Sequence, residues 1–256
     1  MKFNKRFYLF FWFVLPLLSF SKADERAKLL FEKGNACYAK AQYQAALNTY
    51  RKILNEGYQS AIIYYNLGNA SYKMGDIPHA LLYFEKGHKL APGDEDINFN
   101  IRLIDTKITD KIDQVPEFFV TKWYKELLLG ISINTLSIFI VVIVLLASVM
   151  LIIYLFTISL FIKKASFYAS FILFILGVTL IFVANRQVSY FHNHHQAIIF
   201  GSSVTIKSSP DEKSKTLFLI HEGTKVNVLE SSNGWNKIGI NNGNEGWMKG
   251  SDLREI

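Results

Sequence analysis

The sequence of 256 residues predicts a multidomain membrane protein with an all-α repeat module, a two-helix transmembrane hairpin and a small all-β barrel. Three observations predict this fold class. Half of the residues are hydrophobic and only 19% are charged, whereas an average soluble protein has about 25% charged residues. A pattern recurs at a spacing of 34 residues in the N-terminal half. Short alternating segments separated by turn residues follow the last apolar stretch.

The net charge of +7 is confined to the apolar regions of the chain. Residues 1–23 carry +4 and residues 127–186 carry +3, whereas residues 24–126 and 187–256 are each neutral. A nucleic-acid-binding surface needs its basic residues on a folded module, so we expect no nucleic-acid partner. Basic residues that flank apolar segments instead orient a chain in a lipid bilayer, which we expect to be a partner.

A signal peptide is predicted over residues 1–23. A basic start precedes the apolar stretch 7–20, which is shorter than the roughly 20 residues of a spanning helix and contains Pro16. Ser21 and Ala23 stand at the small-residue positions of a cleavage site. An uncleaved anchor is the alternative, and in both cases the residues that follow are exported.

Two transmembrane helices are predicted at 136–162 and 165–185, separated by a turn at 163–164. The segment 127–162 has no charged residue, and each helix is long enough to cross a hydrocarbon core of about 30 Å. A buried soluble hairpin is disfavoured because neither helix has a polar face.

The predicted topology places both folded modules on the periplasmic side of the bacterial inner (cytoplasmic) membrane. Lys163 and Lys164 form the only cytoplasmic turn, in agreement with the positive-inside rule, although Lys122, Lys125 and Arg186 on the other side weaken that agreement. No cytoplasmic domain is expected.

The N-terminal module, residues 24–115, is predicted to consist of two repeats and a capping helix. The matched pairs 34 residues apart are Gly34 with Gly68, Ala41 with Gly75, Tyr43 with Ile77, Ala46 with Ala80, and Tyr50 with Phe84. This pattern resembles the tetratricopeptide repeat, a helix–turn–helix unit. Two repeats bury little surface alone, and the acidic start at residues 94–96 followed by spaced isoleucines predicts the helix that caps them.

The resemblance implies that the module binds extended peptide segments of partner proteins in a concave groove. Alignment with the family places six residues in that groove: Asn35, Tyr38, Tyr65, Asn69, Tyr72 and Lys73. The alternative for Tyr38 and Tyr72 is that they only pack against neighbouring helices. Binding of a C-terminal carboxylate is disfavoured because Phe31 and Asp96 occupy two of the lysine positions that this specificity uses.

Two linkers flank the hairpin. Residues 116–135 are expected to lie at the membrane interface through their aromatic side chains. Residues 186–196 are expected to form a polar, His-rich linker, in which His192, His194 and His195 are weak candidates for a metal site. We predict no metal and no cofactor.

The C-terminal module, residues 197–256, is predicted to be a barrel of five strands, with hairpin turns at 232–234 and 242–244. Its matching segments are 204–210, 217–226, 234–235, 246–247 and 251–253, and they resemble the bacterial SH3-like domain. Such domains bind cell-wall peptides or protein segments. Trp235, beside a turn, is the candidate ligand surface, whereas Trp247 is expected to plug the barrel.

The sequence predicts no enzyme. It lacks the metalloprotease, phosphate-loop and nucleophile-elbow motifs, and its single cysteine, Cys37, excludes a disulfide framework. The order of the parts resembles the BatE family of the Bacteroidetes aerotolerance operon, which implies a scaffold in a membrane complex linked to aerotolerance or envelope stress, with other membrane proteins as partners. The alternative function is a cell-wall sensor or regulator of peptidoglycan hydrolases, with peptidoglycan as the ligand of the barrel.

Overall fold

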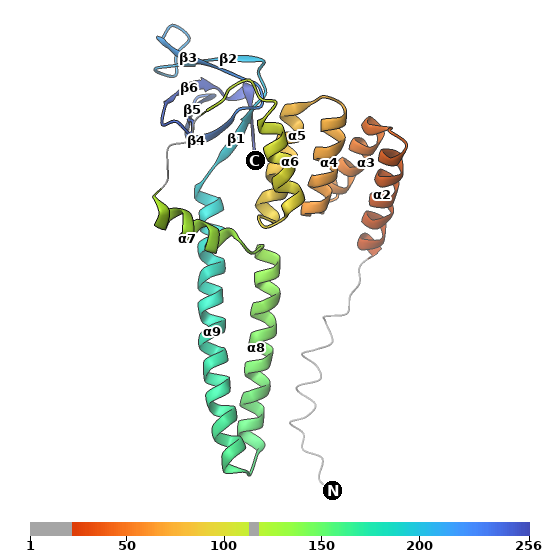
Figure 1. Cartoon of the computed structure of the whole chain (residues 1–256), viewed down its shortest axis with the longest axis vertical. Helices are drawn as coiled ribbons and strands as arrows, with labels where there is room; N and C mark the ends of the chain where they lie inside the picture. Colours follow the sequence, from red (N-terminus) through yellow and green to blue (C-terminus); the bar gives the residue numbers. More distant parts are fainter. Residues whose placement is uncertain (1–21, 113–117) are drawn as a thin grey trace. The chain divides into compact units, whose positions relative to one another are not determined.

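The computed structural model describes residues 22–112 and 118–256, so nearly all of the predicted signal peptide lies outside the described residues. The chain divides into two compact units, Met1–Gln59 and Ser60–Ile256. It contains a helical repeat region, two long apolar helices and a C-terminal antiparallel sheet (Figure 1). The predicted fold class is therefore confirmed.

The first unit contains one helical hairpin, formed by α2 (Lys22–Ala39) and α3 (Tyr43–Asn55). The two helices cross where Gly34 faces the ring of Tyr50, and a side chain at residue 34 would overlap this ring. The Tyr50 hydroxyl donates a hydrogen bond of 2.7 Å to Asn35 Oδ1. The turn between the helices holds Ala41 at a φ of 58°, in the left-handed region.

The second unit begins with a hairpin of the same construction, formed by α4 (Ala61–Lys73) and α5 (Ile77–Leu90). Here Gly68 faces Phe84, and a Cβ atom on Gly68 would lie 2.6 Å from a ring carbon. The turn residue is Gly75, at a φ of 80°. The two hairpins therefore place a glycine, an aromatic ring and a left-handed turn residue at positions 34 residues apart, as the repeat pattern predicts.

The helix α6 (Glu95–Asp105) follows the second hairpin at the predicted position of the cap. The Asp94 carboxylate accepts hydrogen bonds from the backbone N–H groups of Asp96 and Ile97 and thereby caps the helix N-terminus. Ile97 and Ile104 are fully buried in a cluster with side chains of α5. The amphipathic spacing of α6 thus closes the apolar side of the second hairpin.

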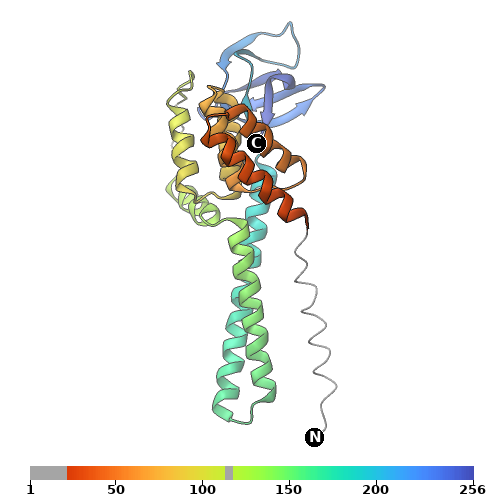
Figure 2. The same cartoon turned by 90° about the vertical axis from the view of Figure 1, so that its right-hand side faces the viewer.

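Three helices follow: α7 (Phe119–Leu129), α8 (Ile133–Phe156) and α9 (Leu160–Asn193). The long helices α8 and α9 run antiparallel and side by side (Figures 1 and 2). The Ser170 hydroxyl of α9 donates a hydrogen bond of 3.0 Å to the Ala147 carbonyl oxygen of α8. Both helices are long and apolar enough to cross a membrane, and little of either is buried within the protein.

The hairpin turn lies at residues 157–159 and not at 163–164, where we predicted it. Lys163 and Lys164 instead belong to the first turn of α9. The prediction of this boundary was wrong because lysine interrupts an apolar run but is a good helix former. Helix α9 also continues to Asn193 through much of the predicted linker 186–196, because this segment contains no glycine or proline to end the helix.

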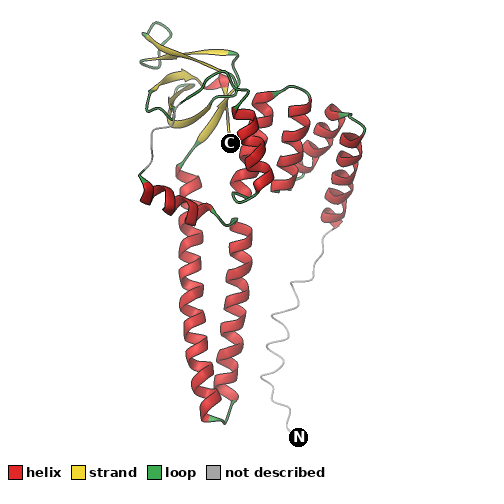
Figure 3. Cartoon of the chain, in the orientation of Figure 1, coloured by secondary structure: helices red, strands yellow, loops and turns green. Residues whose placement is uncertain are grey.

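The C-terminal sheet has seven strands rather than the predicted five, in the order β3-β2-β6-β5-β4-β1-β7 (Figure 3). The short strands β1 and β7, from the two ends of the module, pair with each other. The strands are β1 (Gln196–Ile199), β2 (Ser203–Lys207), β3 (Thr216–His221), β4 (Lys225–Ser232), β5 (Trp235–Gly239), β6 (Glu245–Lys249) and β7 (Leu253–Glu255).

The barrel core contains aliphatic side chains such as Ile206, Ile238 and Met248, each fully buried. On β6 the buried residues Gly246 and Met248 flank Trp247, which is half-buried. Since neighbouring residues of a strand point to opposite faces, Trp247 lies on the outer face of the barrel. The expectation that Trp247 plugs the barrel was therefore wrong, because Met248 occupies that side of the strand.

The two turn residues of the repeats provide a stability test. Substitution Ala41→Gly should raise the stability of the first hairpin by up to about 1 kcal/mol, because alanine pays a steric cost at positive φ that glycine does not. The matched reverse change, Gly75→Ala, should lower stability by a similar amount, since no atom lies within 4 Å of the added Cβ and only the backbone conformation matters. Thermal unfolding of the detergent-solubilised protein measures both changes in stability. If both substitutions raised the stability, or both lowered it, residues 41 and 75 would not share the left-handed conformation.

Candidate functional site

The barrel packs against the second repeat and its cap. Ile198 of β1 is fully buried in the cluster that also contains Leu81 of α5 and Ile97 of α6. After α6 the chain crosses to the barrel, where Ile112 packs against the barrel core. Apolar side chains from both modules therefore form a shared contact within the unit Ser60–Ile256.

Asp110 joins this contact through three hydrogen bonds. Its carboxylate accepts one from the His221 backbone N–H at 2.6 Å and one from the Thr224 hydroxyl at 2.8 Å, and it lies 2.8 Å from His221 Nδ1. Burial alone would raise the pKa of Asp110, but the hydrogen bonds from His221 and Thr224 outweigh burial and hold the pKa below its ordinary value. The ionised carboxylate therefore fixes the turn between β3 and β4 to the segment after α6.

A second polar contact joins Glu85 of α5 to Lys225 of β4 at 2.8 Å. The Glu85 side chain is only 6% exposed, whereas that of Lys225 is 32% exposed. A buried carboxylate is costly unless it is paired, and the barrel lysine supplies the cationic partner of Glu85. The two modules are thus complementary in charge as well as in apolar surface.

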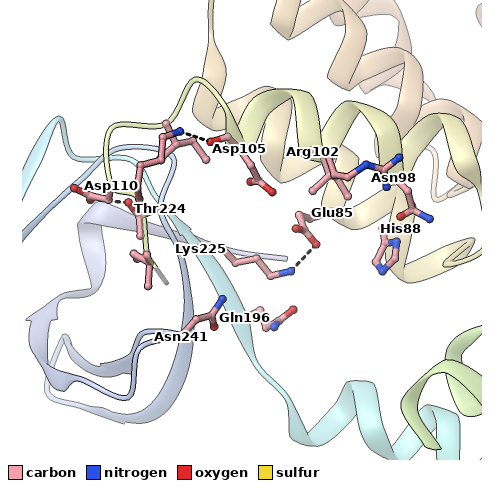
Figure 4. Close-up of a pocket in the computed structure, with 14 residues that line it drawn as sticks. Glu85, His88, Asn98, Arg102, Asp105, Asp110, Gln196, Thr224, Lys225 and Asn241 are labelled. Atoms are coloured by element: carbon pink, nitrogen blue, oxygen red, sulfur yellow. Dashed lines mark hydrogen bonds and ion pairs between the residues drawn. The ribbon is translucent and has the colours of Figure 1, made fainter. Parts of the chain in front are cut away.

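A cleft of about 760 Å³ lies beside these contacts (Figure 4). In Figure 4 the Lys225 side chain extends from the barrel toward Glu85 along one side of the cleft. Most of the lining is polar, with carboxylate, cationic and amide groups from both modules. The polar lining residues are Glu85, His88, Asn98, Arg102, Asp105, Asp110, Lys111, Gln196, Thr224, Lys225 and Asn241.

Two ionisable groups of the cleft are shifted toward their neutral forms. Burial lowers the pKa of His88, and nearby Lys225 lowers it further, against the opposing effects of Glu85 and Asn98. Burial raises the pKa of Asp105, and the negative charge of Glu85 adds to this effect. Burial in the cleft therefore disfavours the charged forms of His88 and Asp105.

The groove residues predicted on α4 lie along one helix. Lys73 is exposed and Asn69 is half-buried, whereas Tyr65 and Tyr72 pack partly against the apolar cluster of α5 and α6. Tyr65 also lies 6.0 Å from the ring of Phe84. Asn69 and Lys73 are thus the α4 positions most available to a ligand.

The remaining predicted groove residues, Asn35 and Tyr38, lie on α2 in the other compact unit. Asn35 Oδ1 accepts a hydrogen bond from the Tyr50 hydroxyl. The ring of Tyr38 packs edge-to-face on that of Tyr43, with the ring centroids 5.3 Å apart. Tyr38 therefore makes the intramodular packing that we gave as its alternative. The role of the six residues in a groove stays a prediction.

The three candidate metal histidines lie at the junction of α9 and β1. His194 stacks on Tyr190 at 4.1 Å, and His192 and His195 have ring centroids 6.3 Å apart. Within residues 22–112 and 118–256, no group of three or more His, Cys, Asp or Glu side chains is arranged to hold a metal ion. These histidines therefore carry no metal proposal.

Trp235 is half-buried at the start of β5 and shares the outer face of the barrel with Trp247. Trp235 pairs with Lys249 and Trp247 pairs with Lys237 across the two strands. The outer face of β5 and β6 thus alternates tryptophan and lysine. Both lysines are paired with carboxylates, Lys237 with Glu245 and Lys249 with Glu212, so this face offers indole rings within a charge-paired surround.

Sequence reasoning missed Asp110, Glu85 and Lys225 because it treated the repeat and the barrel as separate modules. Glu85 stands directly before Lys86, and His88 and Lys89 follow within one helical turn, so the sequence is typical of a solvated end of a helix. It contains no signal that the Glu85 carboxylate is buried or that Lys225 is its partner.

Comparison with known proteins supports both modules. The family described as "Bacterial SH3 domain" matches residues 202–254, and the family described as "Tetratricopeptide repeat" matches residues 61–94, the second predicted copy. The chain thus matches two classes of binding module over these segments, which supports a protein-binding adaptor. A search of curated proteins found no match.

Two solved structures are similar to parts of the chain. One is YrrB, titled a tetratricopeptide-repeat protein with an unusual peptide-binding site, at 23% identity and a TM-score of 0.30 over 32% of this chain and 42% of that one. The other is an NlpC/P60 family protein from Bacillus cereus, at 17% identity and a TM-score of 0.21 over 28% of this chain and 23% of that one. The chain therefore spans less than half the length of either structure.

The Asp110 contact predicts a dependence on pH. Because its folded-state pKa is below the ordinary value of 3.8, its contribution to stability is present above pH 3.8 and is lost as the pH falls through the lower folded value. At pH 7, Asp110→Ala should speed hydrogen exchange of the His221 amide, since removing the acceptor costs about 1–3 kcal/mol. The slower exchange of the His221 amide in the parent protein than in the variant should disappear only in strong acid, where the Asp110 carboxylate is protonated. Asp211→Ala, in an exposed loop, is the control, and an equal effect of both changes would refute the contact.

The Glu85–Lys225 pair can be compared with a pair of similar length at the surface. Lys225→Met leaves a buried carboxylate without its cation and should cost about 3 kcal/mol of unfolding free energy. The additional change Glu85→Gln should recover part of this loss. Lys237→Met breaks the exposed 2.7 Å pair with Glu245 and should change the unfolding free energy little. Chemical unfolding of the solubilised chain measures the unfolding free energy of all three variants. Similar losses of free energy for Lys225→Met and Lys237→Met would contradict a special role for the buried Glu85–Lys225 pair.

Proposed function

We propose that the chain is a non-enzymatic scaffold of a bacterial inner membrane that binds extended segments of partner proteins on the periplasmic side. One observation carries this proposal. A tetratricopeptide repeat and an SH3-like barrel, both binding modules, are joined by Asp110 and the Glu85–Lys225 pair into one unit attached to two long apolar helices. Such a unit presents two binding surfaces in a fixed relation.

The arrangement around the helices supports the proposed topology. The second repeat, α6, α7 and the barrel all lie at one end of the α8–α9 hairpin, and the turn 157–159 lies at the other (Figures 1 and 2). With α8 and α9 in the bilayer, Lys163 and Lys164 come close to the turn end, where the positive-inside rule favours the cytoplasm. The bacterial SH3 domain, a class that suggests an exported location, then lies in the periplasm. A signal peptide over residues 1–23 would start this topology.

Peptide recognition in this proposal uses the exposed side of α4. The Asn69 amide can donate to and accept from the backbone of an extended segment, and Lys73 adds a positive charge one helical turn further along. Tyr65 and Tyr72 form an apolar base beside them that is already ordered by packing, so binding costs little side-chain entropy. Within the first repeat, we propose that Asn35 and Tyr38 contact a partner segment in the same way.

The physiological setting that we propose is a membrane complex for aerotolerance or envelope stress. It rests on the order of the parts, a repeat module, a two-helix hairpin and an SH3-like barrel, which resembles the BatE family. Partners in this setting are other membrane proteins of the same complex, which can contact the exposed apolar sides of α8 and α9.

A second candidate function is binding of peptidoglycan by the barrel, as a cell-wall sensor or a regulator of peptidoglycan hydrolases. The observation that favours it is the outer face of β5 and β6, where Trp235 and Trp247 alternate with lysines. The half-buried indole rings offer stacking area for a cell-wall ligand, and the charged groups of the Lys237–Glu245 and Lys249–Glu212 pairs offer polar contacts beside them.

A photo-crosslinking amino acid at Lys73, installed in the full chain in living cells, should trap a partner protein because this position borders the predicted groove. The added change Asn69→Ala should remove that product. The same group at Lys213, in the exposed loop between β2 and β3, is the matched control and should not trap it. Identical products at both positions would contradict peptide binding at α4. If the solubilised chain instead binds purified cell-wall sacculi, and Trp235→Ala abolishes this, the second function holds.

A further inference from the structure

The helix α7 presents an aromatic face that no described residue covers. Phe119 is 72% exposed, Trp123 63%, Tyr124 49% and Val120 46%. These positions are spaced i, i+1, i+4 and i+5, so they form one continuous stripe along the helix. Leu128, four residues after Tyr124 at the C-terminal end of the helix, is buried. A stripe of exposed aromatic side chains on an otherwise anchored helix requires a partner surface.

α7 is anchored at the end of the apolar hairpin. Gln187 of α9 is 1% exposed and donates a hydrogen bond of 2.9 Å from Nε2 to the Ile131 carbonyl oxygen, in the turn between α7 and α8. Ser132 caps the N-terminus of α8 by accepting from the Thr135 N–H. The C-terminal end of α7 is therefore held at the level of Gln187.

That level coincides with the end of the apolar part of α9. Arg186 is the first charged residue of α9 after Lys164, and it directly precedes Gln187. The 24 residues of α8 span roughly 36 Å, which is slightly more than the roughly 30 Å of a hydrocarbon core. The first turn of α8, and α7 before it, therefore lie where hydrocarbon gives way to headgroups.

The residue types on α7 match that boundary. Tryptophan and tyrosine have an apolar body and a polar tip, which suits them to the headgroup region. Lys122 and Glu126 form an i,i+4 pair at 4.0 Å, with side chains 70% and 65% exposed. Thr121 and Lys122 lie on the side of the helix away from the centre of the stripe, whereas Glu126, seven residues after Phe119, borders the stripe. α7 thus has a lipid-compatible stripe and a water-compatible one.

We propose that α7 is an in-plane membrane-docking helix whose aromatic stripe inserts into the phospholipid leaflet on the side of the folded modules. Phospholipid is the occupant because the stripe continues the exposed apolar surface of α8, where Ile138 is 65% exposed. Docking fixes the height and tilt of the repeat and the barrel above the bilayer. The proposal rests on the membrane insertion of α8 and α9 proposed above.

Spin-label accessibility tests this docking on the full chain. Single cysteines are introduced in a Cys37→Ser background at Val120, Lys122 and, within α8, at Val142. The labelled protein alone is reconstituted into vesicles of phosphatidylethanolamine and phosphatidylglycerol. We expect labels at Val120 and Val142 to collide more with oxygen than with a water-soluble nickel chelate, and the label at Lys122, on the other side of α7, to show the reverse. No other protein is present, so protection at Val120 reports lipid alone.

The three label positions distinguish a failure of the α7 docking proposal from a failure of the membrane-insertion proposal. A lipid-exposed Val142 together with a water-exposed Val120 overturns the docking of α7 but leaves the spanning helices in place. A water-exposed Val142 overturns the membrane insertion and the docking together. In addition, Phe119→Ser with Trp123→Ser should lower the oxygen accessibility at Val120 severalfold, whereas Thr121→Ser with Lys122→Ser should leave it unchanged. An unchanged value in the first variant also overturns the proposal.

Discussion

The hydrogen bonds that converge on the Asp110 carboxylate determine how the barrel is placed on the second repeat. Asp110 follows α6 by five residues, whereas His221 and Thr224 flank the turn between β3 and β4. Without this acceptor the His221 N–H would lack its partner in the interface, which is costly for a partly buried donor. The carboxylate therefore gives the contact a single geometry that apolar packing alone would not specify.

The apolar and charged contacts of the same interface have different consequences. Ile198 removes apolar surface from water, and this favours association without fixing orientation. The Glu85–Lys225 pair contributes little net free energy once desolvation is counted, but it disfavours any placement that would leave Glu85 buried and alone. The second repeat therefore tolerates only a narrow range of barrel positions, and the polar cleft beside them is a consequence of this placement.

Local pattern predicted the parts of the chain well. The 34-residue period gave both the glycine–aromatic crossings and the left-handed turns, because each depends on residues close in sequence. Boundaries were less predictable. Charge was a poor indicator of the hairpin turn, since the backbone at Thr157 and Ser159 leaves the helix while Lys163 and Lys164 remain within it.

The candidate site was predictable only where it lies on a single element. The α4 set follows from the repeat pattern alone, whereas the contacts of Asp110 span 111 residues or more along the chain. Such pairings depend on how two modules meet, and one sequence contains no direct signal for that. The outward position of Trp247 was equally inaccessible, because it depends on the strand register that puts Met248 inside.

The junction of α9 and β1 connects the membrane helix to the interface. Only residues 194–195 separate the end of α9 from β1. This junction is ordered, because the His195 carbonyl oxygen accepts from the Val228 N–H at 2.7 Å and His194 stacks on Tyr190. β1 then carries Ile198 into the apolar cluster of the second repeat. The long apolar helix α9 is therefore joined to the interface of the second repeat and the barrel through a short, hydrogen-bonded connection.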